Sequence, residues 1–305
     1  MENNQNYHIP VLLQDCIDAL NIDPNGTYID VTFGGGGHSK EIFKLLSENG
    51  QLISFDQDQD AAKNTWEAPN FHFVAANFEH ISNHLRMMGI KQVDGILADL
   101  GVSSHQFDEI ARGFSFRGDA KLDMRMNQNA ELSAEELINM YEEAELVRVF
   151  SSYGEIKNSR KLASTIIAAR LSKKIKTTGE FTAVIEHCAP KYKEHKYFAQ
   201  VFQAIRIEVN SEMRALESFL TQCEKIIKPG GRLVVMSYHS LEDRLVKNYM
   251  KRGSLSGEIT KDFFGNVLKP FTEVVRKPII PNEEEIERNS RARSAKLRIA
   301  ERNGE

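Results

Sequence analysis

A run of four glycines near the start of the chain is its first segment with an evident capacity for chemistry. Gly34, Gly35, Gly36 and Gly37 follow a β-branched stretch and precede a segment with helical spacing. Glycine lets the backbone approach a ligand closely, and a helix that begins there offers unpaired N–H groups. Asp56 comes twenty residues after Gly36, where a second strand should end and a carboxylate can accept both ribose hydroxyls. The pattern predicts a nucleoside site; the alternative is a tight turn with an exposed acid.

The residues that follow the glycines indicate which nucleoside. A dinucleotide loop needs a third glycine or alanine, and Ser39 or Lys40 stands there in either alignment of the motif. No Gly-Lys-Ser or Gly-Lys-Thr sequence is present, which excludes a phosphate-gripping loop. Residues 30–36 instead resemble the acid-x-x-x-Gly-x-Gly loop of class I S-adenosylmethionine methyltransferases. Phe78, after the third expected strand, is either an adenine contact or ordinary core.

Two further polar residues are expected at strand ends. Asp99 closes an apolar strand, and His239 follows a second such strand late in the chain. Ligand crevices of doubly wound sheets lie at the carboxyl ends of the strands, so both side chains are predicted to face one crevice. Ser240 and Asp243 are expected to form a capping box at the start of the next helix. His239 is then either a proton relay or base contact, or a structural histidine.

Alternating strands and helices would position these residues. Strands are expected at 27–32, 51–55, 71–75, 93–99 and 232–237. Helices are expected at 39–46, 60–66, 79–88 and 209–227, and an antiparallel pair at 271–276 and 295–300. Such alternation implies a parallel sheet covered on both faces. Between these parts helical spacing dominates, with a capping box at Ser133–Glu136. We therefore expect a sheet domain formed by 1–106 and 208–305, and an inserted helical domain at 107–207.

Composition sets the broad class. The 305 residues are 41% hydrophobic and 27% charged, which is typical of a folded soluble protein. No run reaches the ~18 apolar residues of a membrane helix, and the N-terminus does not resemble a secretory signal. Cys16, Cys188 and Cys223 lie far apart, so we expect no zinc site, no disulfide framework and a cytoplasmic location. With a net charge of −4, any binding to nucleic acid must use local basic patches.

Motifs along nearly the whole chain together resemble a single family. They lie at 8–13, 32–38, 99–106, 112–117, 122–126, 202–207, 237–244 and 291–298. These motifs are similar to those of the MraW family of bacterial ribosomal RNA methyltransferases. The resemblance implies a class I Rossmann-like methyltransferase sheet with an inserted all-helical domain. It also implies methyl transfer from S-adenosyl-L-methionine to the N4 amine of a cytidine, at position 1402 in the decoding centre of 16S rRNA.

The resemblance also assigns residues. It implies cofactor contacts at Gly36, Gly37, His38, Asp56, Phe78, Asp99 and Gln106. This sequence departs from the family pattern at Gly35, where relatives carry arginine, and at His105, which replaces a frequent proline. For catalysis, Asp99 either accepts the N4 proton or contacts the cofactor, and His239 is a second candidate. No metal is expected.

Basic segments are the expected RNA contacts. The C-terminal candidates are Arg291, Arg293 and Lys296. Two more clusters lie in the expected insertion, at 170–176 and 191–196. Lysine and arginine bind phosphates, and a target base must be splayed out of its helix to enter a crevice. The expected partner is therefore 16S rRNA within the small ribosomal subunit, with no membrane contact; the sequence is compatible with a homo-oligomer.

Two other classes of protein use the same architecture. A nicotinamide-dependent oxidoreductase would need the third glycine that this loop lacks. A non-catalytic RNA-binding assembly factor would keep the fold without the cofactor residues, whereas Gly36, Asp56 and Asp99 are all present. A titration with S-adenosylmethionine separates that factor from the methyltransferase.

Overall fold

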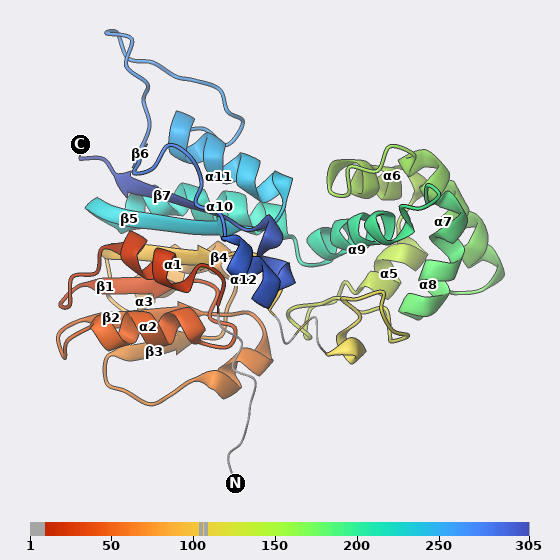
Figure 1. The fold of residues 1–305 in the computed structure, drawn as a ribbon, viewed down its shortest axis with the longest axis horizontal. Coiled ribbons are helices and arrows are strands. Elements are labelled where there is room, and N and C mark those ends of the chain that lie inside the picture. The colour runs from red at the N-terminus through yellow and green to blue at the C-terminus, as the bar shows by residue number, and fades with distance from the viewer. Residues whose placement is uncertain (1–9, 104–105, 107–108, 305) are drawn as a thin grey trace. The chain divides into compact units, whose positions relative to one another are not determined.

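The computed structural model describes residues 10–103, 106 and 109–304, which fall into two compact units (Figure 1). The first contains Met1–Gly101 and Met213–Glu305, and the second contains Val102–Glu212. The boundaries expected from the sequence, 107 and 207, lie five residues inside those of the second unit. Residues 8, 9 and 105, which entered the resemblance, lie outside the described residues.

A seven-stranded sheet organises the first unit, in the order β3-β2-β1-β4-β5-β7-β6. The strands are β1 (Thr27–Asp30), β2 (Gln51–Phe55), β3 (Phe71–Val74), β4 (Val93–Asp99), β5 (Ile227–Ser237), β6 (Phe271–Glu273) and β7 (Lys296–Arg302). Strands β1 to β5 pair in parallel, whereas β7 runs antiparallel between β5 and β6. The expected parallel sheet and its antiparallel pair are confirmed.

Helices cover both faces of this sheet because successive strand residues point to opposite sides. Tyr28, Leu52 and Leu97 belong to one buried cluster, which also contains residues of α1 (Leu13–Leu20) and α2 (Gly37–Leu45). Ile29 and Ile53 belong to the cluster on the other face. The helices of that face are α3 (Ile81–Met87), α10 (Glu212–Ile226) and α11 (Ser240–Arg252). The parallel strands are thus buried on both sides, as their continuous apolar sequences require.

The second unit is helical and has its own buried core. Its helices are α5 (Ala134–Met140), α6 (Glu143–Ser152), α7 (Ser159–Ser172), α8 (Thr178–Ile185) and α9 (Glu194–Val209). The predicted capping box is confirmed: Ser133 Oγ accepts from the N–H of Glu136, whose carboxylate accepts from the N–H of Ser133. This bond pair fixes the start of α5.

Two of the expected helices are wrong in detail. The segment 209–227 is not continuous, because α9 ends at Val209 and α10 begins at Glu212. Ser211 lies between them with φ 51°, a left-handed conformation that interrupts a helix. The expected helix at 60–66 is a 3₁₀ segment, Gln59–Asn64. None of the helices in the described ranges combines the length and apolar character of a membrane span.

Candidate functional site

The glycine loop connects β1 to α2, and two of its glycines adopt backbone angles that favour this residue. Gly34 has φ 50° and Gly36 has φ 75°, both in the left-handed region. A Cβ on Gly36 would also lie 2.9 Å from the ring of Phe33. Gly35 faces open space, so a side chain is tolerated there, in keeping with arginine in relatives. The loop therefore exposes its backbone at the carboxyl edge of the sheet.

The first turn of α2 corrects the expected cap. Gly36 is the N-cap residue, and Ser39 lies inside the helix. Ser39 Oγ donates to Asp30 Oδ2 at 2.6 Å and lies 2.8 Å from Ser54 Oγ. Asp30 is buried, and its other oxygen accepts from Thr32 N. The acid of the loop motif thus joins the ends of β1 and β2 to α2, which holds the glycine loop in place.

Asp56 lies directly after β2 and holds the same loop from the other side. Its Oδ2 accepts from Gly34 N and its Oδ1 from Asp58 N, each at 2.8 Å. Burial raises the pKa of Asp56 to about 6, against the lowering effect of these two bonds. Each carboxylate oxygen can accept more than one hydrogen bond, so Asp56 still has acceptor capacity for ribose hydroxyls.

Asp99 ends β4 and is surrounded by polar groups. Tyr238 donates its hydroxyl to Asp99 Oδ1 at 2.9 Å, and His38 Nδ1 lies 3.7 Å from Oδ2. Its backbone N–H donates to Thr32 Oγ1 at 2.7 Å. Burial raises the pKa of Asp99 to about 6, although His38 and Tyr238 both favour the charged form. A carboxyl group near neutral pKa at the end of a crevice strand can orient a donor and accept a proton.

Tyr238 is the residue that sequence reasoning missed. It follows β5, and burial raises the pKa of its hydroxyl well above the ordinary value, so the hydroxyl remains a donor. Gly101 approaches the ring so closely that a Cβ there would lie 3.2 Å from Tyr238 Cδ2. The available signal was its position, directly after a buried strand and next to His239, where crevice side chains are expected.

His38 contributes a buried nitrogen with no partner. The side chain is 5% exposed and sits in the first turn of α2. Its Nδ1 faces Asp99, whereas Nε2 has no hydrogen-bond partner within the described residues. A buried polar atom of this kind indicates that a polar group binds beside it.

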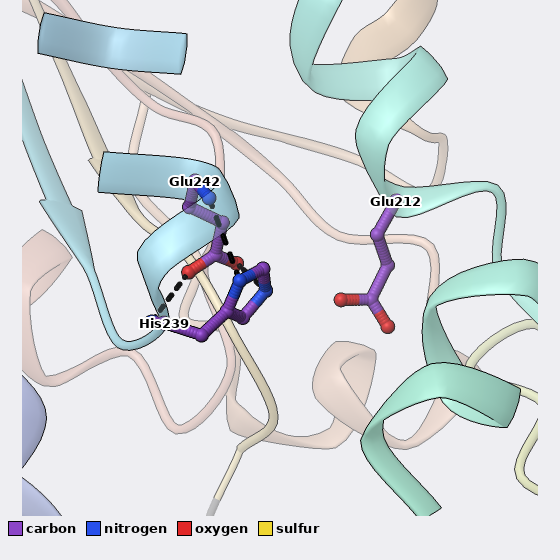
Figure 2. A group of neighbouring side chains, drawn as sticks. All are labelled: Glu212, His239 and Glu242. Carbon is purple, nitrogen blue, oxygen red and sulfur yellow. Dashed lines mark hydrogen bonds and ion pairs between the residues drawn. The ribbon is translucent and has the colours of Figure 1, made fainter. Parts of the chain in front are cut away.

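His239 serves the fold in a way that the sequence only partly indicated. It is the N-cap of α11, and its Nδ1 accepts from Glu242 N at 3.4 Å. Figure 2 shows the imidazole against the Glu242 carboxylate, which accepts from the N–H groups of Tyr238 and His239. The expected box of Ser240 and Asp243 is therefore wrong by one residue. Glu212, also drawn there, belongs to the second unit, where Arg206 binds it through two 2.8 Å hydrogen bonds.

The remaining predicted contacts have different surroundings. Phe78 begins a short 3₁₀ segment and packs edge-on against Phe219, with ring centroids 5.4 Å apart. It is half-buried, so part of its ring faces outward. Gln106 is buried in the second unit, where its Oε1 accepts from Ser103 N at 3.1 Å. Gly37 is required for packing, because a Cβ there would lie 2.3 Å from the ring of Pro10.

The predicted RNA contacts also differ among themselves. Arg291 and Arg293 lie exposed on a 3₁₀ segment, Ser290–Ser294. Lys296 instead forms an ion pair with Asp243 at 3.1 Å, and Arg298 binds the same carboxylate at 2.7 Å. These two bonds lower the pKa of Asp243 against the effect of burial. Lys296 is thus engaged in holding β7 to α11.

Comparisons with known proteins agree along the full chain. Residues 5–303 match the MraW methylase family. A ribosomal RNA small subunit methyltransferase H from Bacteroides fragilis (strain YCH46) is 56% identical, over 99% of this chain and 99% of its own. Its counterpart from Bacteroides thetaiotaomicron is 57% identical, over 97% of each chain. A solved rRNA methylase from Streptococcus thermophilus aligns with a TM-score of 0.38 and 12% identity, covering 96% of this chain and 94% of its own.

Proposed function

The chain belongs to the MraW methylase family, and from that premise we propose that it methylates the N4 amine of cytidine 1402 in 16S rRNA. Its fold is that of a class I methyltransferase, a Rossmann-like sheet with helices on both faces, and its methyl donor is S-adenosylmethionine. The substrate assignment rests on the similarity to small subunit rRNA methyltransferases and on the polar cluster at the end of β4. We further propose that the protein acts in the cytoplasm, on the small ribosomal subunit, and that the helical unit is an inserted domain.

The residues at the carboxyl edge of the sheet fit this cofactor. The left-handed glycines expose backbone near the edge, and Asp56 has acceptor capacity for a ribose. The unpartnered Nε2 of His38 is a buried polar atom that a bound polar ligand would satisfy. We assign Gly36, His38 and Asp56 to cofactor binding on these grounds, with Phe78 and Gln106 as further candidates. The cofactor supplies an electrophilic methyl group on a positively charged sulfur.

Asp99 is the proposed acceptor of the N4 proton. The cytosine amine is a weak nucleophile, so the protein must orient it and remove a proton as the new bond forms. With a pKa of about 6, Asp99 is mostly ionised at neutral pH and can accept a hydrogen bond from N4. Tyr238 holds the carboxylate in one orientation through the 2.9 Å bond to Oδ1, which leaves Oδ2 toward His38. Tyr238 is then a positioning residue.

Methylation of the small subunit tests the proposal. We expect the N4-methyl group to be missing from 16S rRNA of a strain without this gene, and to return with the wild-type gene. Asp99→Asn keeps the shape but removes the charge, and should lower single-turnover rates by ~10²–10⁴-fold with little change in RNA affinity. Unchanged modification in the deleted strain would refute the substrate. Near-normal turnover of Asp99→Asn would leave Asp99 as a cofactor contact.

A further inference from the structure

Two segments of the second unit come together into one basic surface. Residues 155–161 lead into α7, and residues 186–196 connect α8 to α9 (Figure 1). Asn158 Nδ2 donates to the carbonyl of Cys188 at 2.9 Å, and Tyr197 donates its hydroxyl to Asn158 Oδ1 at 3.2 Å. Lys161 Nζ reaches the carbonyl of His187 at 3.5 Å. These contacts hold the two segments side by side.

The charges on this surface are unequal. The two segments carry six cationic residues against three glutamates, Glu155, Glu186 and Glu194. All six cationic side chains are exposed: Lys157, Arg160, Lys161, Lys191, Lys193 and Lys196. No ion pair involves any of the six within the described ranges, so their charge is available to a partner. We call these six residues, together with Tyr192, the basic platform.

The other basic run of this unit is engaged internally. Lys173 pairs with Glu180, and Lys174 pairs with Glu135 at 2.9 Å. Arg170 donates to the carbonyls of Ile138 and Tyr141. The sequence presents both runs as equal candidates for RNA binding, and the structure separates them. Only the basic platform offers several uncompensated charges together, which is what a polyanion requires.

Tyr192 stands in the middle of the basic platform with its ring in solvent. It is 95% exposed and has φ 63°, a conformation that non-glycine residues rarely adopt. Glu194 accepts from Tyr192 N at 2.9 Å, which helps to hold the turn. An exposed ring flanked by Lys191 and Lys193 has the composition of a stacking site for unpaired bases, where the ring contacts a base and the lysines contact phosphates.

We propose that the basic platform binds a single-stranded segment of the rRNA substrate, with Tyr192 stacking on an unpaired base and the surrounding lysines on its phosphates. This proposal rests on the proposed function for the identity of the RNA. It adds a second contact on the substrate, carried by the helical unit and separate from the residues that bind the cofactor and the target cytidine. Phosphate contacts give affinity, and stacking favours unpaired over helical RNA.

Removing the ring tests the stacking. Asparagine tolerates left-handed backbone, so Tyr192→Asn removes the ring without adding strain, and Tyr192→Phe is the matched control that keeps it. The probe is a single-stranded oligoribonucleotide that carries 2-aminopurine, whose fluorescence falls when it stacks. Wild type and Tyr192→Phe should quench the probe. Tyr192→Asn should not, and should bind roughly 5- to 150-fold more weakly, as expected for ~1–3 kcal/mol of stacking per base. Equal quenching by all three would overturn the stacking.

Removing charge tests the platform. Lys191→Gln/Lys193→Gln and Lys173→Gln/Lys174→Gln change the net charge equally, but only the first pair lies on the basic platform. We expect the first variant to lose affinity and to lower the slope of log affinity against log salt by about 1.4, or ~0.7 for each phosphate contact. The second should bind as wild type does. Equal losses in both would overturn the proposal, as would a change of the platform variants in oligomeric mass rather than in RNA affinity.

These measurements need no methyl transfer, so the two proposals can fail separately. Retained binding by the platform variants refutes the platform whatever reaction the protein performs. Unmodified cytidine N4 in an otherwise active protein refutes the substrate while the binding result stands. With small subunits as substrate, platform variants should raise KM and leave kcat close to wild type, because the basic platform contains none of the residues assigned to the reaction.

Discussion

Replacing Tyr238 with phenylalanine should shift the pH dependence of methyl transfer, because it removes one hydroxyl beside Asp99. That hydroxyl donates to the buried carboxylate at 2.9 Å and favours its charged form. Hydrogen bonds to charged groups contribute about 1.5–3 kcal/mol, and 1.36 kcal/mol corresponds to one pKa unit. The loss should therefore raise the pKa of Asp99 from about 6 to roughly 7–8.

The sign of the activity change follows from which form of Asp99 is needed. Only the ionised carboxylate accepts a proton, and at pH 7 its fraction should fall from about nine tenths to between roughly a half and a tenth. We expect a rate about 2- to 10-fold lower at pH 7, full recovery near pH 9, and an acid limb displaced by roughly one to two pH units. The assay is single-turnover methylation of small subunits at saturating cofactor across this pH range.

A matched control exists in the same unit. Tyr249 is also buried and donates its hydroxyl to a carboxylate, Glu224 Oε2, at 3.3 Å. Tyr249→Phe should leave the acid limb where it is in wild type. An unshifted limb in Tyr238→Phe would refute the role given to this hydrogen bond. A loss that is equal at every pH would also refute it, since the charge of Asp99 would then not be the quantity that changed.

Three further predictions concern the cofactor, the cap and the C-terminal arginines. Asp56→Ala should weaken S-adenosylmethionine binding by roughly 10- to 100-fold, from charge-assisted bonds of about 1.5–3 kcal/mol, and calorimetry giving wild-type affinity would exclude Asp56 from the site. Since its pKa is about 6, wild-type affinity should also fall below that pH, approaching tenfold per pH unit, and a flat profile would contradict the assignment. His239→Ala should remove about 0.5–2 kcal/mol of helix capping and lower the melting temperature, with His239→Asn restoring it; turnover lost at unchanged melting temperature would instead place His239 in the reaction. Arg291→Glu/Arg293→Glu should weaken RNA binding and reduce its salt dependence with cofactor affinity unchanged, and an identical salt slope would disprove the contact.

Local patterns predicted the elements wherever the decisive contacts are local. The strand at 93–99 and the capping box at Ser133–Glu136 agree residue for residue, because apolar runs and i to i+3 bonds are visible in sequence. The start of α2 was misplaced, since Gly36 caps it by conformation and Ser39 bonds to Asp30 instead. The break at Ser211 was missed because helical spacing continues on both sides of it.

The parts of the site that sequence could not predict depend on long-range contacts. Asp99 was expected at the crevice, but its bond to Tyr238 joins residues 139 positions apart. The same holds for the basic platform, where Asn158 joins a segment thirty residues away. Sequence also cannot show which charges are already paired, and Lys296 and Lys173 proved to be so. Composition and spacing identify the chemistry, whereas partner choice is a property of the fold.

The position of β7 has a consequence for the birth of the protein. This strand is the last in the chain, yet it lies between β5 and β6 and pairs with both. During synthesis, every other strand emerges before it, and β5 must wait with an open edge that is prone to pair with other chains. Lys296 and Arg298, which bind Asp243 on α11, then lock the arriving strand in place. Maturation of this enzyme therefore depends on late chain release, so premature termination before residue 296 should yield aggregates rather than a shortened active form.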